Sequence, residues 1–163
     1  MTTAGARFSG DDRYRYRLWR RWSPGPVIGF CMLNPSTADA SRDDPTIRRC
    51  IGFARAWGYG GVEVVNVFAL RATEPSLLRR GRDPVGPGND AALAAATARV
   101  DAIVIAWGVH GTLLQRDRTV LALLSRTRLL ALGWTRSGQP RHPLYLRRDT
   151  RPFAIASAAR CVA

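Results

Sequence analysis

Residues 27–39, VIGFCMLNPSTAD, decide how the chain is expected to fold. Residues 27–33 are mostly apolar, and a short run of this kind is typical of a strand buried on both faces of a parallel sheet. Pro35 cannot take part in a strand ladder, so the strand is predicted to end at Asn34. The polar residues that follow would then lie at the carboxyl end of the strand, where open α/β sheets bind ligands. The alternative is that residues 34–36 form an ordinary turn.

Strands and helices are predicted to alternate along the rest of the chain. Asp44 and Pro45 have the residue types of a helix N-cap and a first helical position, and Gly58 is a typical helix stop. Further strands are predicted over residues 62–70, 101–107 and 129–132, with helices over residues 90–99 and 112–125. We therefore expect one α/β domain over residues 1–163, a three-layer sandwich with a short four-stranded, mostly parallel sheet.

The segment before this core has a different pattern. Residues 11–22, DDRYRYRLWRRW, alternate arginine with tyrosine and tryptophan. We interpret residues 1–22 as containing an edge strand. The alternative is an extended arm that holds a nucleic-acid strand by charge and by stacking.

The charge of the chain favours a polyanionic partner. The net charge is +13, and all 25 basic residues are arginine. Contacts with phosphate release counterions, and arginine can bind phosphate through two parallel hydrogen bonds. Codon bias would explain arginine in place of lysine, but it would not explain the shortage of acidic residues. We therefore expect nucleic acid as the partner.

Other classes of protein fit the sequence poorly. The odd number and wide spacing of Cys31, Cys50 and Cys161 predict neither a disulfide framework nor a metal site, so we interpret them as buried or incidental thiols. No cofactor and no metal are predicted. No stretch reaches the roughly 18 apolar residues that span a bilayer, and the N-terminus has no apolar signal segment. We expect a cytoplasmic monomer that does not bind membranes.

A distinctive polar residue marks each predicted core strand. Asn34 ends the first strand, Asn66 lies near the end of the second, Trp107 ends the third, and His142 is in the loop after the fourth. Because the carboxyl ends of parallel strands share one edge of a sheet, two amides and an imidazole are expected around one pocket. No nucleophile–base motif, metal cluster or phosphate loop is present in the sequence.

The motifs resemble those of the DUF1643 family over roughly residues 14–153. The resemblance is carried by LNPSTAD at 33–39, DPTIRRC at 44–50, NVFALRAT at 66–73, AWG at 106–108 and HPLYL at 142–146. The order of the motifs is also similar to that of the uracil-DNA glycosylase superfamily. Those enzymes have a four-stranded parallel sheet with an Asp-Pro or Asn-Pro element, an Asn, in some branches a Trp-Gly, and a His-Pro loop after successive strands.

The second resemblance implies removal of uracil or a modified pyrimidine from DNA by hydrolysis of the N-glycosidic bond. It assigns catalysis to Asn34, which would hold a water molecule, and to His142, which would donate to the leaving base. Asn66 would read the pyrimidine edge. The residues implied to surround the substrate with Asn66 are Pro35, Ser36, Thr37 and Trp107. Asn66 could instead satisfy the backbone at a strand end, and His142 could be a surface residue.

The resemblance also implies a DNA-binding surface. Leu144, Tyr145 and Leu146 could fill the gap that a flipped base leaves, although this run could equally be a strand that returns to the core. The arginines expected at phosphates are Arg71, Arg141, Arg147 and Arg148. His110 is expected to be a structural neighbour of the pocket.

Two departures from the glycosylase pattern affect the expected substrate. Ser36 stands where uracil-specific members have a bulky tyrosine, so a pocket at this position would tolerate a substituent on C5 of the base. The aromatic residue that stacks on the base has no match between Thr37 and Pro45, which leaves Phe30, Phe53 and Phe68 as candidates. A nucleic-acid-binding module without catalysis, or an enzyme that acts on free nucleotides, remains the alternative function.

Overall fold

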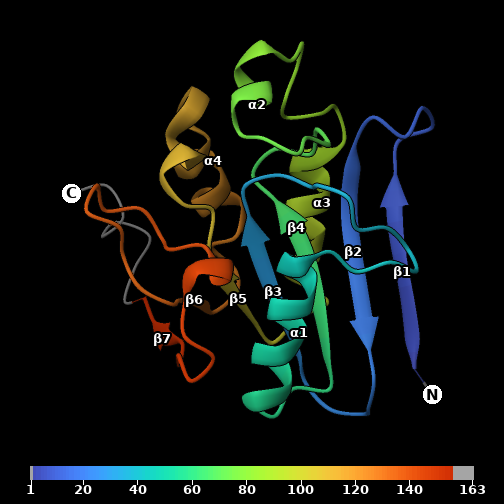
Figure 1. Ribbon diagram of the computed structural model, residues 1–163, viewed down its shortest axis with the longest axis vertical. Coiled ribbons are helices and arrows are strands. Elements are labelled where there is room, and N and C mark those ends of the chain that lie inside the picture. Colours follow the sequence, from blue (N-terminus) through green and yellow to red (C-terminus); the bar gives the residue numbers. More distant parts are fainter. Residues whose placement is uncertain (1, 156–163) are drawn as a thin grey trace.

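The computed structural model describes residues 2–155, which form a mixed seven-stranded sheet with helices on both faces (Figure 1). The strand order is β1-β2-β4-β3-β5-β6-β7. The strands are β1 (Thr3–Phe8), β2 (Arg15–Arg21), β3 (Val27–Met32), β4 (Gly61–Asn66), β5 (Ala102–Ile105), β6 (Leu129–Ala131) and β7 (Phe153–Ala154).

The four predicted strands form the centre of this sheet. β4, β3, β5 and β6 are neighbours in that order, and all three pairings between them are parallel. The three outer pairings, of β1 with β2, β2 with β4, and β6 with β7, are antiparallel. The α/β class is confirmed. The expectation of a four-stranded, mostly parallel sheet is wrong, because β1 and β2 extend the sheet antiparallel on one side and β7 extends it antiparallel on the other.

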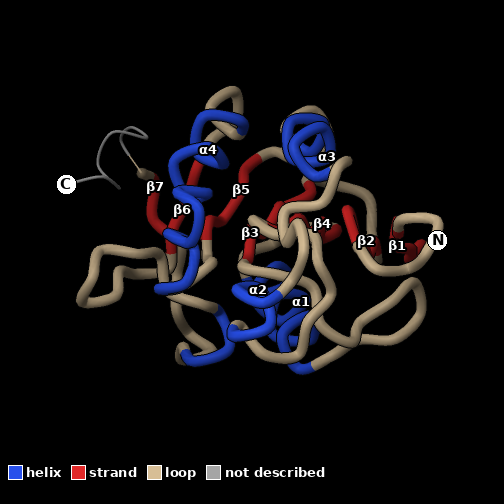
Figure 2. Tube along the Cα trace, turned by 90° about the horizontal axis from the view of Figure 1, so that it is seen from above, coloured by secondary structure: helices blue, strands red, loops and turns tan. Residues whose placement is uncertain are grey.

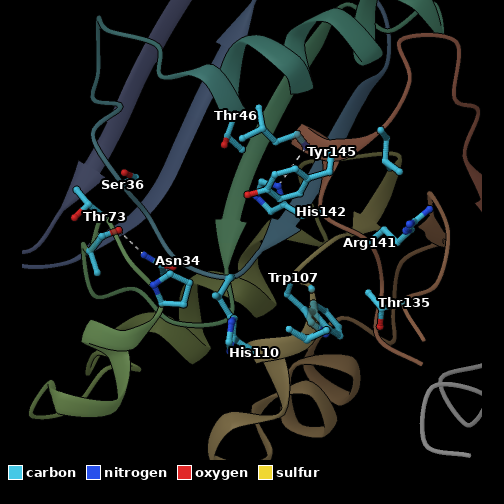
Figure 3. A pocket seen from close by; sticks show the side chains of 17 residues that line it. Asn34, Ser36, Thr46, Thr73, Trp107, His110, Thr135, Arg141, His142 and Tyr145 are labelled. Carbon is cyan, nitrogen blue, oxygen red and sulfur yellow. Dashed lines mark hydrogen bonds between the residues drawn. The ribbon is translucent and has the colours of Figure 1, made fainter. Parts of the chain in front are cut away.

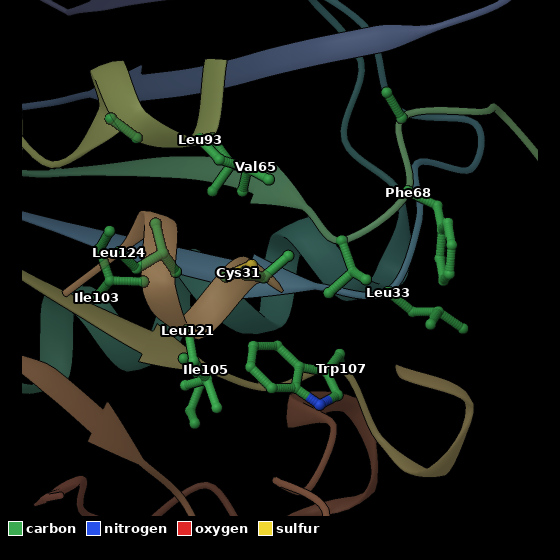
Figure 4. Packing of buried hydrophobic residues seen from close by; sticks show 14 of the residues in the cluster. Cys31, Leu33, Val65, Phe68, Leu93, Ile103, Ile105, Trp107, Leu121 and Leu124 are labelled. Atoms are coloured by element: carbon green, nitrogen blue, oxygen red, sulfur yellow. The ribbon is translucent and has the colours of Figure 1, made fainter. Parts of the chain in front are cut away.

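The helices cover the two faces of the sheet. Figure 2 shows α1 on one side and α3 and α4 on the other. The helices are α1 (Pro45–Ala56), α2 (Ser76–Arg80), α3 (Asn89–Ala96) and α4 (Arg116–Leu123), with 3₁₀ helices η1 (Val109–Gln115) and η2 (Pro143–Tyr145). Each face has its own apolar core, one that includes Leu93 and Leu121 under α3 and α4 (Figure 4) and one that includes Ile47 and Phe53 under α1.

Helix α1 begins and ends as its sequence predicts. The side chain of Asp44 accepts a hydrogen bond from the backbone N–H of Ile47 at 2.9 Å, and Pro45 is the first helical residue. Gly58, just beyond the helix, has a φ of 85°, a conformation that favours glycine. This cap matters for function because it fixes the first turn of α1 directly after the loop that carries Asn34.

The single helix predicted over residues 112–125 is interrupted. η1 and α4 meet at Leu114 and Gln115, whose φ values are 55° and 54°. Non-glycine residues rarely adopt this left-handed conformation. No glycine or proline marks the break in the sequence, so the periodicity of the apolar residues carried the prediction across it.

The N-terminal segment is a β-hairpin that belongs to the sheet. β2 pairs with β1 on one side and with β4 on the other, so it is an interior strand and β1 is the edge strand. Residues 1–22 thus contain an edge strand, as expected, but it is β1. The alternating segment at residues 11–22 that suggested it forms the interior strand β2 instead, and the alternative of an extended arm is wrong.

Two of the three cysteines lie within the described residues. Cys31 and Cys50 are free and buried, and burial raises the pKa of both thiols. Cys161 lies outside the described residues. Among the helices within residues 2–155, none has the length and apolar character needed to cross a membrane.

Candidate functional site

A cleft of about 540 Å³ opens at the carboxyl ends of β3 and β5 (Figure 3). Its walls come from the loop after β3, the first turn of α1, the segment after β4, and the segment around η2. The polar side chains that line it are Asn34, Ser36, Thr46, Thr73, His110, Thr135, Arg141 and His142. No carboxylate of the described residues lines the cleft, so its ionisable groups are neutral or positive.

Asn34 is held in one orientation. Its Nδ2 donates to the carbonyl oxygens of Pro35 at 2.9 Å and of Ala72 at 2.8 Å. These two acceptors fix which end of the amide is the nitrogen. Oδ1 receives no hydrogen bond from any described residue, so the cleft wall at this point offers a hydrogen-bond acceptor.

His142 offers the complementary group. The backbone N–H of Leu144 donates to Nδ1 of His142 at 3.2 Å, which places the proton of the neutral ring on Nε2. Burial lowers the pKa of His142, and this outweighs the attraction of Asp44 for the charged form. His142 is therefore neutral at pH 7 and carries a donor N–H at the cleft.

Trp107 lines the cleft at the end of β5. The indole Nε1 donates to Oε1 of Gln139 at 2.9 Å, and the ring is almost completely buried. A Cβ atom on Gly111 would come within 2.1 Å of the Trp107 ring, so glycine is needed there for the ring to fit. The hydrogen bond and the close packing together hold this wall rigid.

Tyr145 lies at the rim of the cleft. Its side chain is 85% exposed, and its ring lies 5.8 Å from the His142 ring, centroid to centroid. Leu144 and Leu146 also line the cleft and are half-buried. Residues 143–145 form η2, so the alternative of a strand that returns to the core is wrong.

Comparison with known proteins gives one match. A family model described as "Protein of unknown function (DUF1643)" matches residues 15–144. The chain belongs to the DUF1643 family. No curated protein and no solved structure matches it. The match of this DUF1643 protein includes Asn34, Trp107 and His142, and it ends one residue before Tyr145.

Asn66 does not join the cleft of the DUF1643 protein. It is 2% exposed, and its Oδ1 accepts a 3.5 Å hydrogen bond from Nη2 of Arg15. Arg15 also donates to the carbonyl oxygen of Ala38, which ties the loop after β3 over this position. Nδ2 of Asn66 and Nε of Arg15 are buried without a partner among the described residues. The expected meeting of two amides and an imidazole is wrong in this respect: one amide and one imidazole share the cleft.

The remaining residues of the Asn-Pro loop separate into two groups. Ser36 lines the cleft, as expected. Pro35 is buried beneath the loop, where its carbonyl oxygen accepts from Asn34 and Ala72, and Thr37 is exposed outside the cleft. The substrate-binding role predicted for Pro35 and Thr37 therefore has no geometric basis in the cleft.

The predicted phosphate contacts also differ among themselves. Arg141 lines the cleft and is exposed. Arg71 instead donates to the carbonyl oxygen of Asp12 at 3.1 Å, and its guanidinium lies 4.9 Å from the Phe8 ring. Arg147 is exposed away from the cleft and pairs with Asp149 at 3.0 Å, which lowers the pKa of that carboxyl.

None of the three candidate stacking residues reaches the cleft. Phe30, Phe53 and Phe68 are buried, and none lines it. The aromatic rings that do line the cleft are those of Trp107, His110, His142 and Tyr145. His110 is exposed and lines the cleft, so its expected position beside the pocket is confirmed.

Sequence reasoning missed three hydroxyl groups at the cleft: Thr46, Thr73 and Thr135. Thr46 follows Pro45 in the first turn of α1, and its place at the predicted helix start was the one signal that could have identified it. Within residues 2–155, no group of three or more His, Cys, Asp or Glu side chains is arranged to hold a metal ion.

Proposed function

We propose that this DUF1643 protein is a DNA glycosylase-like enzyme that hydrolyses the N-glycosidic bond of uracil or a modified pyrimidine. One observation supports this most strongly: the free amide oxygen of Asn34 and the neutral imidazole of His142 line the same cleft. An acceptor for water and a donor for a leaving anion are the two groups that such a reaction requires.

The reaction begins with extrusion of the target nucleotide, because the glycosidic bond cannot be reached inside a base stack. Oδ1 of Asn34 accepts a hydrogen bond from a water molecule and holds it against C1′ of the sugar. The C1′–N bond breaks, the water oxygen bonds to C1′, and the base leaves as an anion with the bonding electron pair. The proton that the water loses passes through solvent to the departed base, so the products are a neutral base and an abasic sugar hydroxyl. An amide is sufficient for this step because a sugar with cationic character needs a positioned water more than a strong base.

His142 stabilises the departing base. Its Nε2–H donates to a carbonyl oxygen of the pyrimidine as negative charge develops there. The lowered pKa of His142 keeps the ring neutral, with Nδ1 free to accept from Leu144. A positioned donor of this kind contributes about 10²–10³ in rate. The lack of carboxylates in the described lining favours the anionic leaving group further.

The rim of the cleft suits an extruded base. The exposed Tyr145 fills the gap in the stack, because it is the most exposed of residues 144–146. Arg141 neutralises a phosphate beside it. Asn66 reads no base in this proposal, and the hydroxyls of Ser36 and Thr46 take that role. Because Ser36 is small, a C5 substituent on the pyrimidine is accepted.

The order of the motifs adds support. The Asn-Pro, Trp-Gly and His-Pro pairs follow three adjacent parallel strands, β3, β5 and β6, in the order of the uracil-DNA glycosylase superfamily. The functional likeness rests on these pairs together with the cleft chemistry.

The test is release of a base from oligonucleotides that each contain one uracil, thymine or 5-hydroxymethyluracil. Abasic product is detected by strand cleavage in alkali. Asn34→Ala and His142→Ala should each lower the rate by about 10² or more while DNA binding persists. Thr37→Ala, an exposed change outside the cleft in the same loop, is the matched control and should leave the rate unchanged.

The outcomes separate the three functions. Binding of DNA with no abasic product on any substrate would contradict catalysis and favour a binding module on this fold. Weak binding that does not change with salt would favour an enzyme of free nucleotides, because phosphate contacts impose a steep salt dependence.

A further inference from the structure

A second hollow lies beside the cleft, on the outer side of α1. We call it the α1 groove; its volume is about 550 Å³, and the residues that matter here are Arg48, Arg49, Gly52, Phe53, Leu144 and Arg148. One wall is α1, and the other is η2 with the segment that follows it. Leu144 lines both the α1 groove and the cleft, so the two hollows adjoin along this side chain.

The α1 groove is open and shallow at its centre. Gly52 has no side chain, and a Cβ atom built there would meet nothing within 4 Å. The Phe53 ring lies beneath, and the guanidinium of Arg49 is 5.8 Å from its centroid. The lining of the α1 groove is therefore apolar at Phe53 and Leu144 and basic at its three arginines.

The charge of the α1 groove has one sign. Three arginines line it, and no acidic side chain does. Arg148 makes no hydrogen bond with any described residue. Arg48 donates to the carbonyl oxygen of Asp43 at 2.7 Å, an interaction that leaves its positive charge unpaired. The described residues therefore provide no anion for these three side chains.

We propose that the α1 groove binds the sugar-phosphate backbone of the DNA strand whose base enters the cleft. This inference rests on the proposed function, and it adds the path of the strand. Phosphates lie against Arg48, Arg49 and Arg148, and the strand passes Leu144 to reach the cleft. A polyanion with one charge per nucleotide matches walls that carry three arginines and no acid.

The experiment measures binding of a fluorescent single-stranded oligonucleotide at several salt concentrations. The test variant is Arg48→Gln/Arg49→Gln/Arg148→Gln. Loss of three phosphate contacts should make the plot of log K against log salt shallower by about 2 units, and should weaken binding at low salt at least tenfold. Arg148→Gln alone should account for about 0.7 of a unit, and it removes no hydrogen bond to a described residue.

The matched control removes the same charge from the other side of the sheet. Arg118, Arg126 and Arg128 are exposed, on or just after α4, and their side chains make no hydrogen bond with described residues. Their triple change to glutamine should alter the slope by less than half as much. Equal effects of the two triple variants, or no binding by the unaltered protein, would overturn the proposal.

Base release distinguishes this proposal from the proposed function. Groove-dependent binding without release of any base supports the α1 groove and contradicts the glycosylase. Base release that the groove variants leave unchanged, with unchanged affinity for the oligonucleotide, supports the glycosylase and contradicts the α1 groove.

Discussion

The arginines of β2 and the arginines near the cleft carry the same charge in opposite surroundings. Arg17 pairs with Glu63 at 2.9 Å, and Arg20 pairs with Asp43 at 2.9 Å. Arg15 is buried, and burial lowers its pKa to about 10, so it remains charged at neutral pH. By contrast, Arg141 and Arg148 are exposed and make no side-chain hydrogen bond with described residues. The first group holds the fold together, and the second is free for a ligand.

The difference shows why net charge alone is a weak guide to a binding surface. The strongest local pattern of arginine and aromatic residues, at residues 11–22, belongs to the hairpin and uses its charges internally. The arginines available to a polyanion are scattered in sequence and come together only in the fold. Four measurements test this difference between the structural and the exposed arginines.

The largest effect is expected at Glu63, the partner of two arginines. Its carboxylate is 3% exposed and binds Arg17 and, through two nitrogens, Arg99. Glu63→Ala should lower the free energy of unfolding by about 3 kcal/mol, because it leaves the guanidinium groups of Arg17 and Arg99 without their anionic partner. Denaturant unfolding measures this. Glu74→Ala, at an exposed site, should change it by less than about 0.5 kcal/mol. If Glu63→Ala lowers the free energy of unfolding by less than about 1 kcal/mol, water hydrates Arg17 and Arg99 in place of the carboxylate.

Arg20 should have the next largest effect. Its guanidinium binds the Asp43 carboxylate and the carbonyl oxygens of Asp39 and Arg42, and so fastens the loop that follows Asn34. Arg20→Ala should cost about 2 kcal/mol of unfolding free energy, because hydrogen bonds to charged groups are strong. Arg7→Ala, an exposed change on β1, is the control. If both variants have the same free energy of unfolding, Arg20 contributes no more to stability than an exposed arginine does.

A smaller, pH-dependent effect is expected at His142. Burial lowers its pKa in the folded state, so below the ordinary value of 6.5 the unfolded chain takes up a proton that the folded protein resists. The free energy of unfolding should therefore fall as the pH drops from 6.5 to 5.5, a range in which arginine does not titrate. His142→Gln should reduce this fall, measured by denaturant unfolding at several pH values. His110→Gln serves as the control, and equal pH dependence in all three proteins would contradict the effect.

The smallest change in stability is expected at Arg141. Its exposed guanidinium makes no hydrogen bond with a described residue, so Arg141→Gln should change the unfolding free energy by less than about 0.5 kcal/mol. The same variant should weaken oligonucleotide binding and lower its salt slope by about 0.7. Thermal unfolding and binding are measured on one preparation. A destabilised Arg141→Gln variant with unchanged oligonucleotide binding would place Arg141 among the arginines that stabilise the fold.

Local chemistry made much of the fold predictable. The apolar run at residues 27–33 gave β3, and Asp44, Pro45 and Gly58 gave both ends of α1. The position of β1, with the sequence TAGARF, was not predicted, because its small residues show no alternation of apolar and polar side chains. The break at Leu114 was not predicted either, because neither Leu114 nor Gln115 is a residue type that signals a left-handed backbone.

The sequence predicted which residues of the candidate site follow the strand ends, but not which of them are open to the cleft. Asn34 and His142 were expected at one edge of the sheet, and both line the cleft. Asn66 is at the same edge, but neighbouring chain covers it, and sequence does not indicate which strand-end side chains remain open. The phosphate contact predicted for Arg71 was wrong for a related reason. The sequence does not indicate that its guanidinium donates to the backbone carbonyl oxygen of Asp12.

The hold on the Asn34 amide has a consequence for how the protein ages. Deamidation would turn this residue into an aspartate, which has no N–H to give to the carbonyl oxygens of Pro35 and Ala72. The usual route runs through attack by the next backbone nitrogen on the side-chain carbonyl to give a cyclic imide. Proline has no backbone hydrogen to lose at that nitrogen. Pro35 thus protects the amide of Asn34 from slow chemical conversion to an acid.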